Sequence, residues 1–199
     1  MKRVLAIVLA TAVGASLAFA TGTVTTLPEK VRNALTSIDI VPTKNQLAYA
    51  FGTQDPANVL SNLSTIAKDK EIDIGVRLRA IHALAKYCTD PCTTSELAHQ
   101  SLTTLITDLK NETIGEPIVL LRAAIETIGT LRVDTDASVL IPLLDHPSRD
   151  IRAATARALR DLCNNQAINP LRVRYTSEPT DQVKLAISEA LRILGQCGL

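Results

Sequence analysis

The sequence of 199 residues contains few aromatic side chains, with no Trp, three Tyr and two Phe. Proteins that bind single-stranded nucleic acids stack the bases on aromatic rings. The formal net charge is only +1 at pH 7, so the chain also lacks the broad basic field that binding to a phosphate backbone requires. We therefore do not expect nucleic acid among its partners.

Long apolar runs are absent except at the start of the sequence. Lys2 and Arg3 precede an apolar stretch over residues 4–19, and an Ala-Phe-Ala pattern ends at Ala20. A basic start, a short apolar stretch and small residues at its end are typical of a secretory signal peptide. A membrane anchor would need about 20 continuous apolar residues. We expect cleavage after Ala20, no membrane insertion of the remaining chain, and a periplasmic or secreted location.

Motifs of common catalytic and metal sites are also missing. The sequence has no Gly-rich phosphate loop, no Gly-x-Ser-x-Gly and no His-Glu-x-x-His. The three histidines, His82, His99 and His146, are followed by Ala, Gln and Pro rather than by Glu. The His-Glu pairs of iron-binding helical-repeat enzymes are therefore absent. We expect no catalytic residue, no metal ligand and no bound cofactor.

Helical periodicity dominates what remains, whereas strand signals are weak, without an Asn-Gly hairpin or sustained alternation. Four segments align without gaps and start with an aliphatic residue followed by a base. Each places small or apolar residues four and seven positions later, which is one face of a helix. Their starts lie 45, 30 and 32 residues apart, and the segments are residues 76–84, 121–129, 151–159 and 183–191.

Another amphipathic stretch precedes each of these segments, which predicts repeated helix pairs. The preceding stretches cover residues 55–68, 94–109, 138–145 and 165–175. Pro142 and Pro170 occupy similar places in the last two, which predicts a tolerated bend in each helix. Residues 43–46 and 93–96 each fit a capping box at a helix start.

The helix pair over residues 136–163 resembles the HEAT-repeat family, especially its short bacterial repeats. Its first helix contains Leu-Ile-Pro-Leu-Leu-Asp, and after a short turn its second begins Ile-Arg-Ala-Ala. The resemblance covers roughly residues 55–197. It implies an all-α fold, a right-handed α–α superhelix of about four helix pairs. We expect a signal peptide at residues 1–20, an N-terminal helical cap at 21–54 and the repeat domain at 55–199.

The four cysteines predict two disulfides, because an even count in an exported chain favours bonded pairs. Cys88 and Cys163 occupy equivalent places two repeats apart, too distant for the roughly 4.4–6.8 Å Cα separation of a disulfide. Cys197 lies at the same end of the next second helix as Cys163. We therefore predict one disulfide between Cys163 and Cys197 and a second between Cys88 and Cys92. A zinc or redox site is the alternative, but a lone Cys-x3-Cys is weak evidence for either.

Basic residues recur at one position of the aligned segments, at Arg77, Arg122, Arg152 and Lys184. They could face an acidic partner as a stripe. We favour a structural role, in which each base pairs with an acid at the turn between helices, such as Asp73, Asp150 or Asp181. Outward polar residues of the second helices are an alternative contact surface. Together the candidates for a binding face are Arg77, Arg79, Lys86, Arg122, Glu126, Arg152, Arg160, Lys184 and Arg192.

The hypothesis favoured by the sequence is an exported, non-enzymatic scaffold that binds a protein or peptide. Two alternatives stay open. One is an enzyme, or an accessory subunit of an envelope enzyme, since some short-repeat HEAT proteins are lyases. The other is a purely structural envelope component. Resemblance of the repeat does not decide among these functions.

Overall fold

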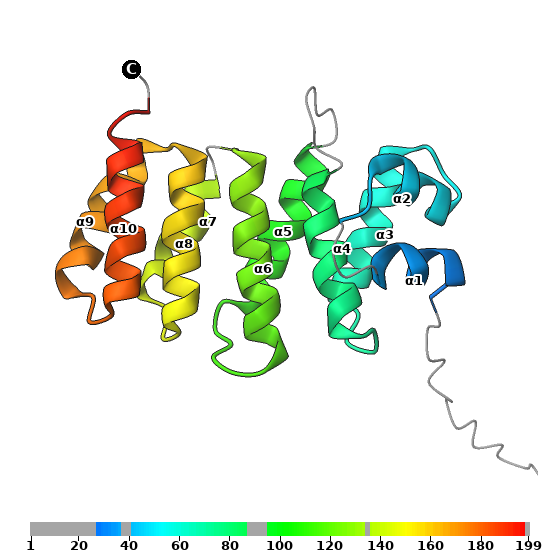
Figure 1. Cartoon of the computed structure of the whole chain (residues 1–199), viewed down its shortest axis with the longest axis horizontal. Coiled ribbons are helices and arrows are strands. Elements are labelled where there is room, and N and C mark those ends of the chain that lie inside the picture. The colour runs from blue at the N-terminus through cyan, green and yellow to red at the C-terminus, as the bar shows by residue number, and fades with distance from the viewer. Residues whose placement is uncertain (1–26, 37–40, 87–94, 134–135, 198–199) are drawn as a thin grey trace, which may run out of the picture.

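The computed structural model describes residues 27–36, 41–86, 95–133 and 136–197 (Figure 1). In these ranges every regular element is a helix. The elements are α1 (Glu29–Thr36), α2 (Lys44–Phe51), α3 (Pro56–Lys68), α4 (Ile74–Lys86), α5 (Ser95–Leu109), α6 (Glu116–Leu131), α7 (Ala137–Leu140), the 3-10 helix η2 (Ile141–Asp145), α8 (Arg149–Leu162), the 3-10 helix η3 (Asn165–Ala167), α9 (Ile168–Ser177) and α10 (Asp181–Leu194).

The helices form four antiparallel pairs behind a cap, as the sequence predicted. The pairs are α3 with α4, α5 with α6, α7–η2 with α8, and α9 with α10, and the cap consists of α1 and α2. Figure 1 shows the second helices α4, α6, α8 and α10 side by side in one layer, with the first helices behind them. The fold is therefore an all-α solenoid. No helix of the described ranges is long and apolar enough to cross a membrane.

Local sequence signals fix where the helices begin and bend. Thr43 and Gln46 form the predicted capping box of α2, and Asp55 caps α3 through the amide of Ala57. The second predicted box, at residues 93–96, falls largely outside the described ranges. Pro142 lies where α7 tightens into the 3-10 turn η2. Pro170 lies in the first turn of α9, just after η3, where a proline removes no helical hydrogen bond.

The core runs between the two layers, and small residues let the second helices approach closely. A Cβ built on Gly129 of α6 would lie 3.0 Å from the Cα and 3.1 Å from the Cβ of Ala158 on α8. Glycine fits at this position because the neighbouring helix occupies the space of a side chain. This contact joins the second and third pairs.

A disulfide connects Cys163 with Cys197, which confirms one predicted pair, at a Cα separation of 5.7 Å. Cys163 ends α8 in the left-handed conformation, with φ of 56°, and Cys197 follows the end of α10. The bond therefore joins equivalent ends of the last two second helices. The predicted pair of Cys88 and Cys92 lies outside the described residues, as does the predicted signal peptide.

Candidate functional site: the inner face of the second helices

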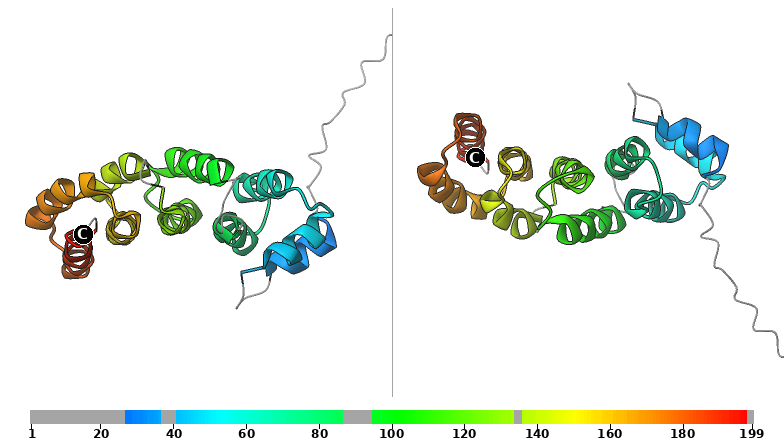
Figure 2. Two further views of the ribbon diagram at one scale, coloured as in Figure 1. Left: turned by 90° about the horizontal axis from the view of Figure 1, so that it is seen from above. Right: turned by 90° about the horizontal axis from the view of Figure 1, so that it is seen from below.

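The second helices line the concave side of a gently curved solenoid (Figure 2). Residues spaced three or four apart share one face of a helix, and on each second helix one such face is not buried. We call this surface the inner face. It consists of Leu78, His82 and Lys86 on α4, Arg122, Glu126 and Thr130 on α6, Arg157, Arg160 and Asp161 on α8, and Leu185, Glu189 and Arg192 on α10.

Arg77 and Arg152 do not belong to this surface, which corrects two residues of the predicted binding face. Both are only 6% exposed. Arg77 donates from Nε to the carbonyl of Ala67, and its guanidinium lies 3.8 Å from Glu116. Arg152 donates to Glu178 and to the carbonyls of the preceding turn. Arg77 thus joins α4 to α3, and Arg152 joins α8 to the preceding turn and to the segment before α10. The acidic partners of these arginines are not Asp73 and Asp150.

Arg122 occupies a different place from Arg77 and Arg152, so the four bases form no ladder. In α6 it is Leu121 that is fully buried, while Arg122 is exposed. The burial pattern of α6 thus fits α8 with a shift of one residue from the sequence alignment, so that Glu126 corresponds to Arg157. The shift places Arg122 and Glu126 on the inner face. Lys184 keeps the aligned position but is partly exposed.

A hollow of about 520 Å³ opens on the inner face between α4 and α6. His82 and Thr127 meet at its floor, where Nδ1 lies 3.1 Å from Oγ1. Burial lowers the pKa of His82, although Glu126 opposes the shift, so the ring is neutral at pH 7. The remaining lining residues come from both helices and from the segment before α2, and they are Val41, Ala85, Lys86, Glu126 and Thr130.

Ion pairs neutralise part of the charge of the inner face. Arg122 donates from Nε to Glu126 at 2.8 Å within α6. Arg160 contacts Asp161 at 2.8 Å and reaches Glu189 on α10 at 3.0 Å, which ties the last two second helices together. Each acidic residue of the inner face is therefore engaged by an arginine.

Three cations of the inner face are not engaged in this way. Lys86, Arg157 and Arg192 form no hydrogen bond or ion pair with another residue of the described ranges. Arg79, also a predicted contact residue, lies partly buried on α4 and donates to the carbonyl of Gly75 at 3.3 Å. The sequence analysis missed Arg157, although its place in α8 matches that of His82 in α4, which the repeat alignment already showed.

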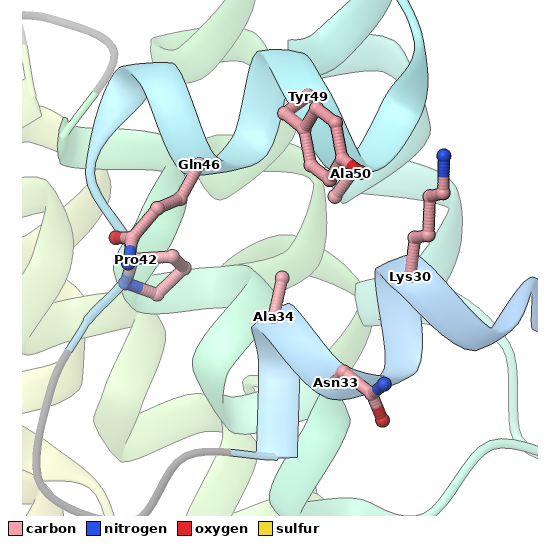
Figure 3. Close-up of a pocket in the computed structure, with 7 residues that line it drawn as sticks. All are labelled: Lys30, Asn33, Ala34, Pro42, Gln46, Tyr49 and Ala50. Carbon is pink, nitrogen blue, oxygen red and sulfur yellow. The ribbon is translucent and has the colours of Figure 1, made fainter.

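A second hollow, of about 260 Å³, lies between the two helices of the cap (Figure 3). Tyr49 of α2 is 68% exposed, and Lys30 of α1 places its Nζ 4.7 Å from the centre of that ring. No residue of the repeat pairs lines this hollow, so it is separate from the inner face.

His99 is the histidine in closest contact with an acid, away from the inner face. Its Nδ1 lies 2.5 Å from Oδ1 of Asp136, which precedes α7 and is fully buried. Burial raises the pKa of Asp136 to about 6. The third histidine, His146, bridges the second and third pairs through the carbonyl of Glu112. Among the described residues no three His, Cys, Asp or Glu side chains come together as metal ligands.

Comparison with protein families finds HEAT repeats over residues 106–192, from α5 into α10. This stretch holds the inner-face residues of three second helices. HEAT repeats are generally scaffolds for protein interaction. Comparison with curated proteins finds no significant match.

Proposed function

The chain is a HEAT-repeat protein, and from this premise we propose that it is an exported scaffold that binds a protein or peptide partner on its inner face. The observation that carries the proposal is the inner face itself. It is concave, it contains a hollow large enough for side chains of a partner, and three of its cations have no acidic partner in the described ranges.

Two observations support export. The first twenty residues have the composition of a signal peptide. Independently, the bond between Cys163 and Cys197 is of a kind that persists in oxidising compartments and is rare in reducing ones. The scaffold would accordingly act in the periplasm or outside the cell.

The support for a binding role over a catalytic one comes from how the polar residues are used. The buried arginines bond to carbonyls and to Glu178, and the inner-face acids are held in ion pairs. These groups are engaged in contacts within the fold. The accessible remainder, a mixture of cations with the partly buried Leu78 and the exposed Leu185, has the composition of a contact surface.

The test is affinity capture from the cells that make the protein, with three forms of the full chain. The wild type is compared with an inner-face variant, Arg157→Glu with Leu185→Glu, and with an outer-face variant, Arg172→Glu with Val173→Glu on α9. Arg172 and Val173 are exposed, so both variants carry matched changes. We expect proteins that the wild type and the outer-face variant capture and the inner-face variant loses. Equal capture by all three forms would contradict the proposal.

A further inference from the structure

The inner-face cations that have no acidic partner in the described ranges define the chemistry of the partner. We propose that the inner face binds an acidic segment of a protein, whose carboxylates meet Lys86, Arg157 and Arg192. This inference rests on the proposed function and specifies its partner. We call these three residues the cationic row.

The inner face carries more cations than its own acids engage. Its acids, Glu126, Asp161 and Glu189, are each within 3.0 Å of an arginine nitrogen. The cations of the row have no such partner in the described ranges. A bound segment therefore meets net positive charge, and electrostatic complementarity favours carboxylates at these points.

The cations of the row come from three of the second helices, α4, α8 and α10. In the repeat register the three cations lie within four residues of one another along their helices, or about 6 Å. Neighbouring packed helices lie about 8–10 Å apart. Lys86 on α4 and Arg157 on α8 are separated by α6, so they lie about 16–20 Å apart, and Arg192 on α10 lies one helix further.

An extended chain advances about 3.3 Å per residue, which converts these distances into a sequence pattern. In the bound segment, the acidic residues that contact Lys86 and Arg157 would be about five or six positions apart. The acidic residue that contacts Arg192 would follow about three positions later. A segment of nine or ten residues thus spans the row. Between the first two acids it passes the hollow of α4 and α6, where an apolar side chain can rest against Ala85 and Val41.

Glu126 gives the inference a test in which affinity rises rather than falls. Glu126 lines the hollow, on the helix that separates Lys86 from Arg157. Its ion pair with Arg122 leaves one cation fewer to meet the carboxylates of a partner. Glu126→Gln removes a charge that repels the acidic segment and frees Arg122. A gain of binding cannot result from a damaged fold.

The experiment measures binding of fluorescent decapeptides to the full chain by anisotropy. The probe carries Glu at positions 1, 6 and 9 with Ala and Leu between. One comparison peptide carries the three Glu at positions 1, 2 and 3, and another carries Lys in place of Glu. A single-stranded DNA 10-mer, which has more negative charge but no peptide chain, serves as the control for charge alone. We expect the spaced acidic peptide to bind most tightly, and its affinity to fall as salt rises.

We expect Arg157→Glu to lower the affinity at least about fivefold, Glu126→Gln to raise it about twofold or more, and Arg172→Glu on the outer face to change it little. Equal affinities for the spaced and clustered peptides, stronger binding of DNA, or no effect of Arg157→Glu would each overturn the inference. The proposed function would survive these results if the capture experiment still distinguished the inner face from the outer face.

Discussion

Arg152 on α8 and Glu178 before α10 form a buried two-point ion pair, with Nε to Oε2 at 2.8 Å and Nη2 to Oε1 at 2.7 Å. The pair joins the third repeat to the fourth. Arg174 also donates to Glu178, at 2.9 Å. Because the carboxylate is fully buried, its partners determine whether its charge is tolerated at all.

Arg152→Met leaves Glu178 buried with only Arg174 to balance it. We expect the free energy of unfolding at pH 7 to fall by about 3 kcal/mol, the lower end of the range for breaking a buried pair, measured by urea denaturation. Arg149→Met is the matched control, because Arg149 is exposed and lies 4.0 Å from Asp150; a change below about 1 kcal/mol is expected there. Equal small losses for both variants would mean that the buried pair contributes little.

Acid should remove the contribution of Glu178. The bonds from Arg152 and Arg174 lower the pKa of Glu178 to about 2, from an ordinary value of 4.5. A carboxylate with a depressed folded-state pKa stabilises the fold fully above its unfolded value and loses this effect as the pH falls towards the folded value. We expect the unfolding free energy to decline between pH 4.5 and 2, and Glu178→Gln to flatten this decline. An unchanged slope in the variant would exclude Glu178 as its source.

Asp136 should produce the opposite slope at higher pH. Burial raises its pKa to about 6 beside His99, so the folded chain holds a proton that the unfolded chain releases near pH 4. Stability should therefore decrease as the pH rises from about 4 to 6. Thermal unfolding of Asp136→Asn across this range should show a smaller decrease than the wild type. Parallel curves for the two proteins would contradict the assignment.

Reduction of the bond between Cys163 and Cys197 should loosen the last repeat. The bond closes a loop with a sequence separation of 34, for which chain entropy predicts a contribution of about 3–4 kcal/mol. We expect Cys163→Ser with Cys197→Ser to lower the midpoint of thermal unfolding and to expose the amides of α10 first in hydrogen exchange. Reductant should lower the wild-type midpoint towards that of the variant. Protection of α10 that survives the double substitution would show that packing alone holds the last helix.

Gly129→Ala should destabilise the protein although alanine favours helix. The intrinsic gain is about 0.5–1 kcal/mol, whereas overpacking a filled contact costs about 1–3 kcal/mol. The obstruction is the Cα of Ala158 at 3.0 Å, which cannot move aside as a flexible side chain could. We therefore expect a net loss of about 1 kcal/mol in chemical denaturation.

Gly195→Ala provides the control for this substitution, because the added Cβ would lie 3.5 Å from its nearest neighbour at an ordinary φ of −65°. Its stability should change by less than about 0.5 kcal/mol. A Gly129→Ala protein as stable as the wild type would show that α6 and α8 can separate at little cost.

The repeat was predictable because helix pairs leave a periodic apolar pattern that the sequence displays directly. The same register correctly paired Cys163 with Cys197, since equivalent ends of neighbouring helices must lie close together. It failed at Arg122, because an aliphatic–basic dipeptide also occurs one residue out of register in α6, and only the burial of Leu121 distinguishes the two alignments. The contact of His99 with Asp136 joins residues that lie far apart in the sequence, so no local sequence pattern predicts it.

Arg77 and Arg152 illustrate a second limit. Their recurrence fits a binding stripe as well as a structural contact, and the sequence favoured the structural one without identifying the atoms that each arginine contacts. Both arginines donate to carbonyls of the preceding helix or turn, and Arg152 also donates to Glu178. A sequence pattern does not show which backbone carbonyl an arginine contacts.

Site-specific photocross-linking in living cells tests the binding role of the inner face most directly. A photoreactive amino acid is placed in turn at exposed inner-face positions, Thr130 and Leu185, and at exposed outer-face positions, Thr104 and Val173. We predict that the same partner protein cross-links from Thr130 and Leu185 and from neither outer position. Cross-links that arise only from the outer positions, or equally from all four, would contradict binding on the inner face.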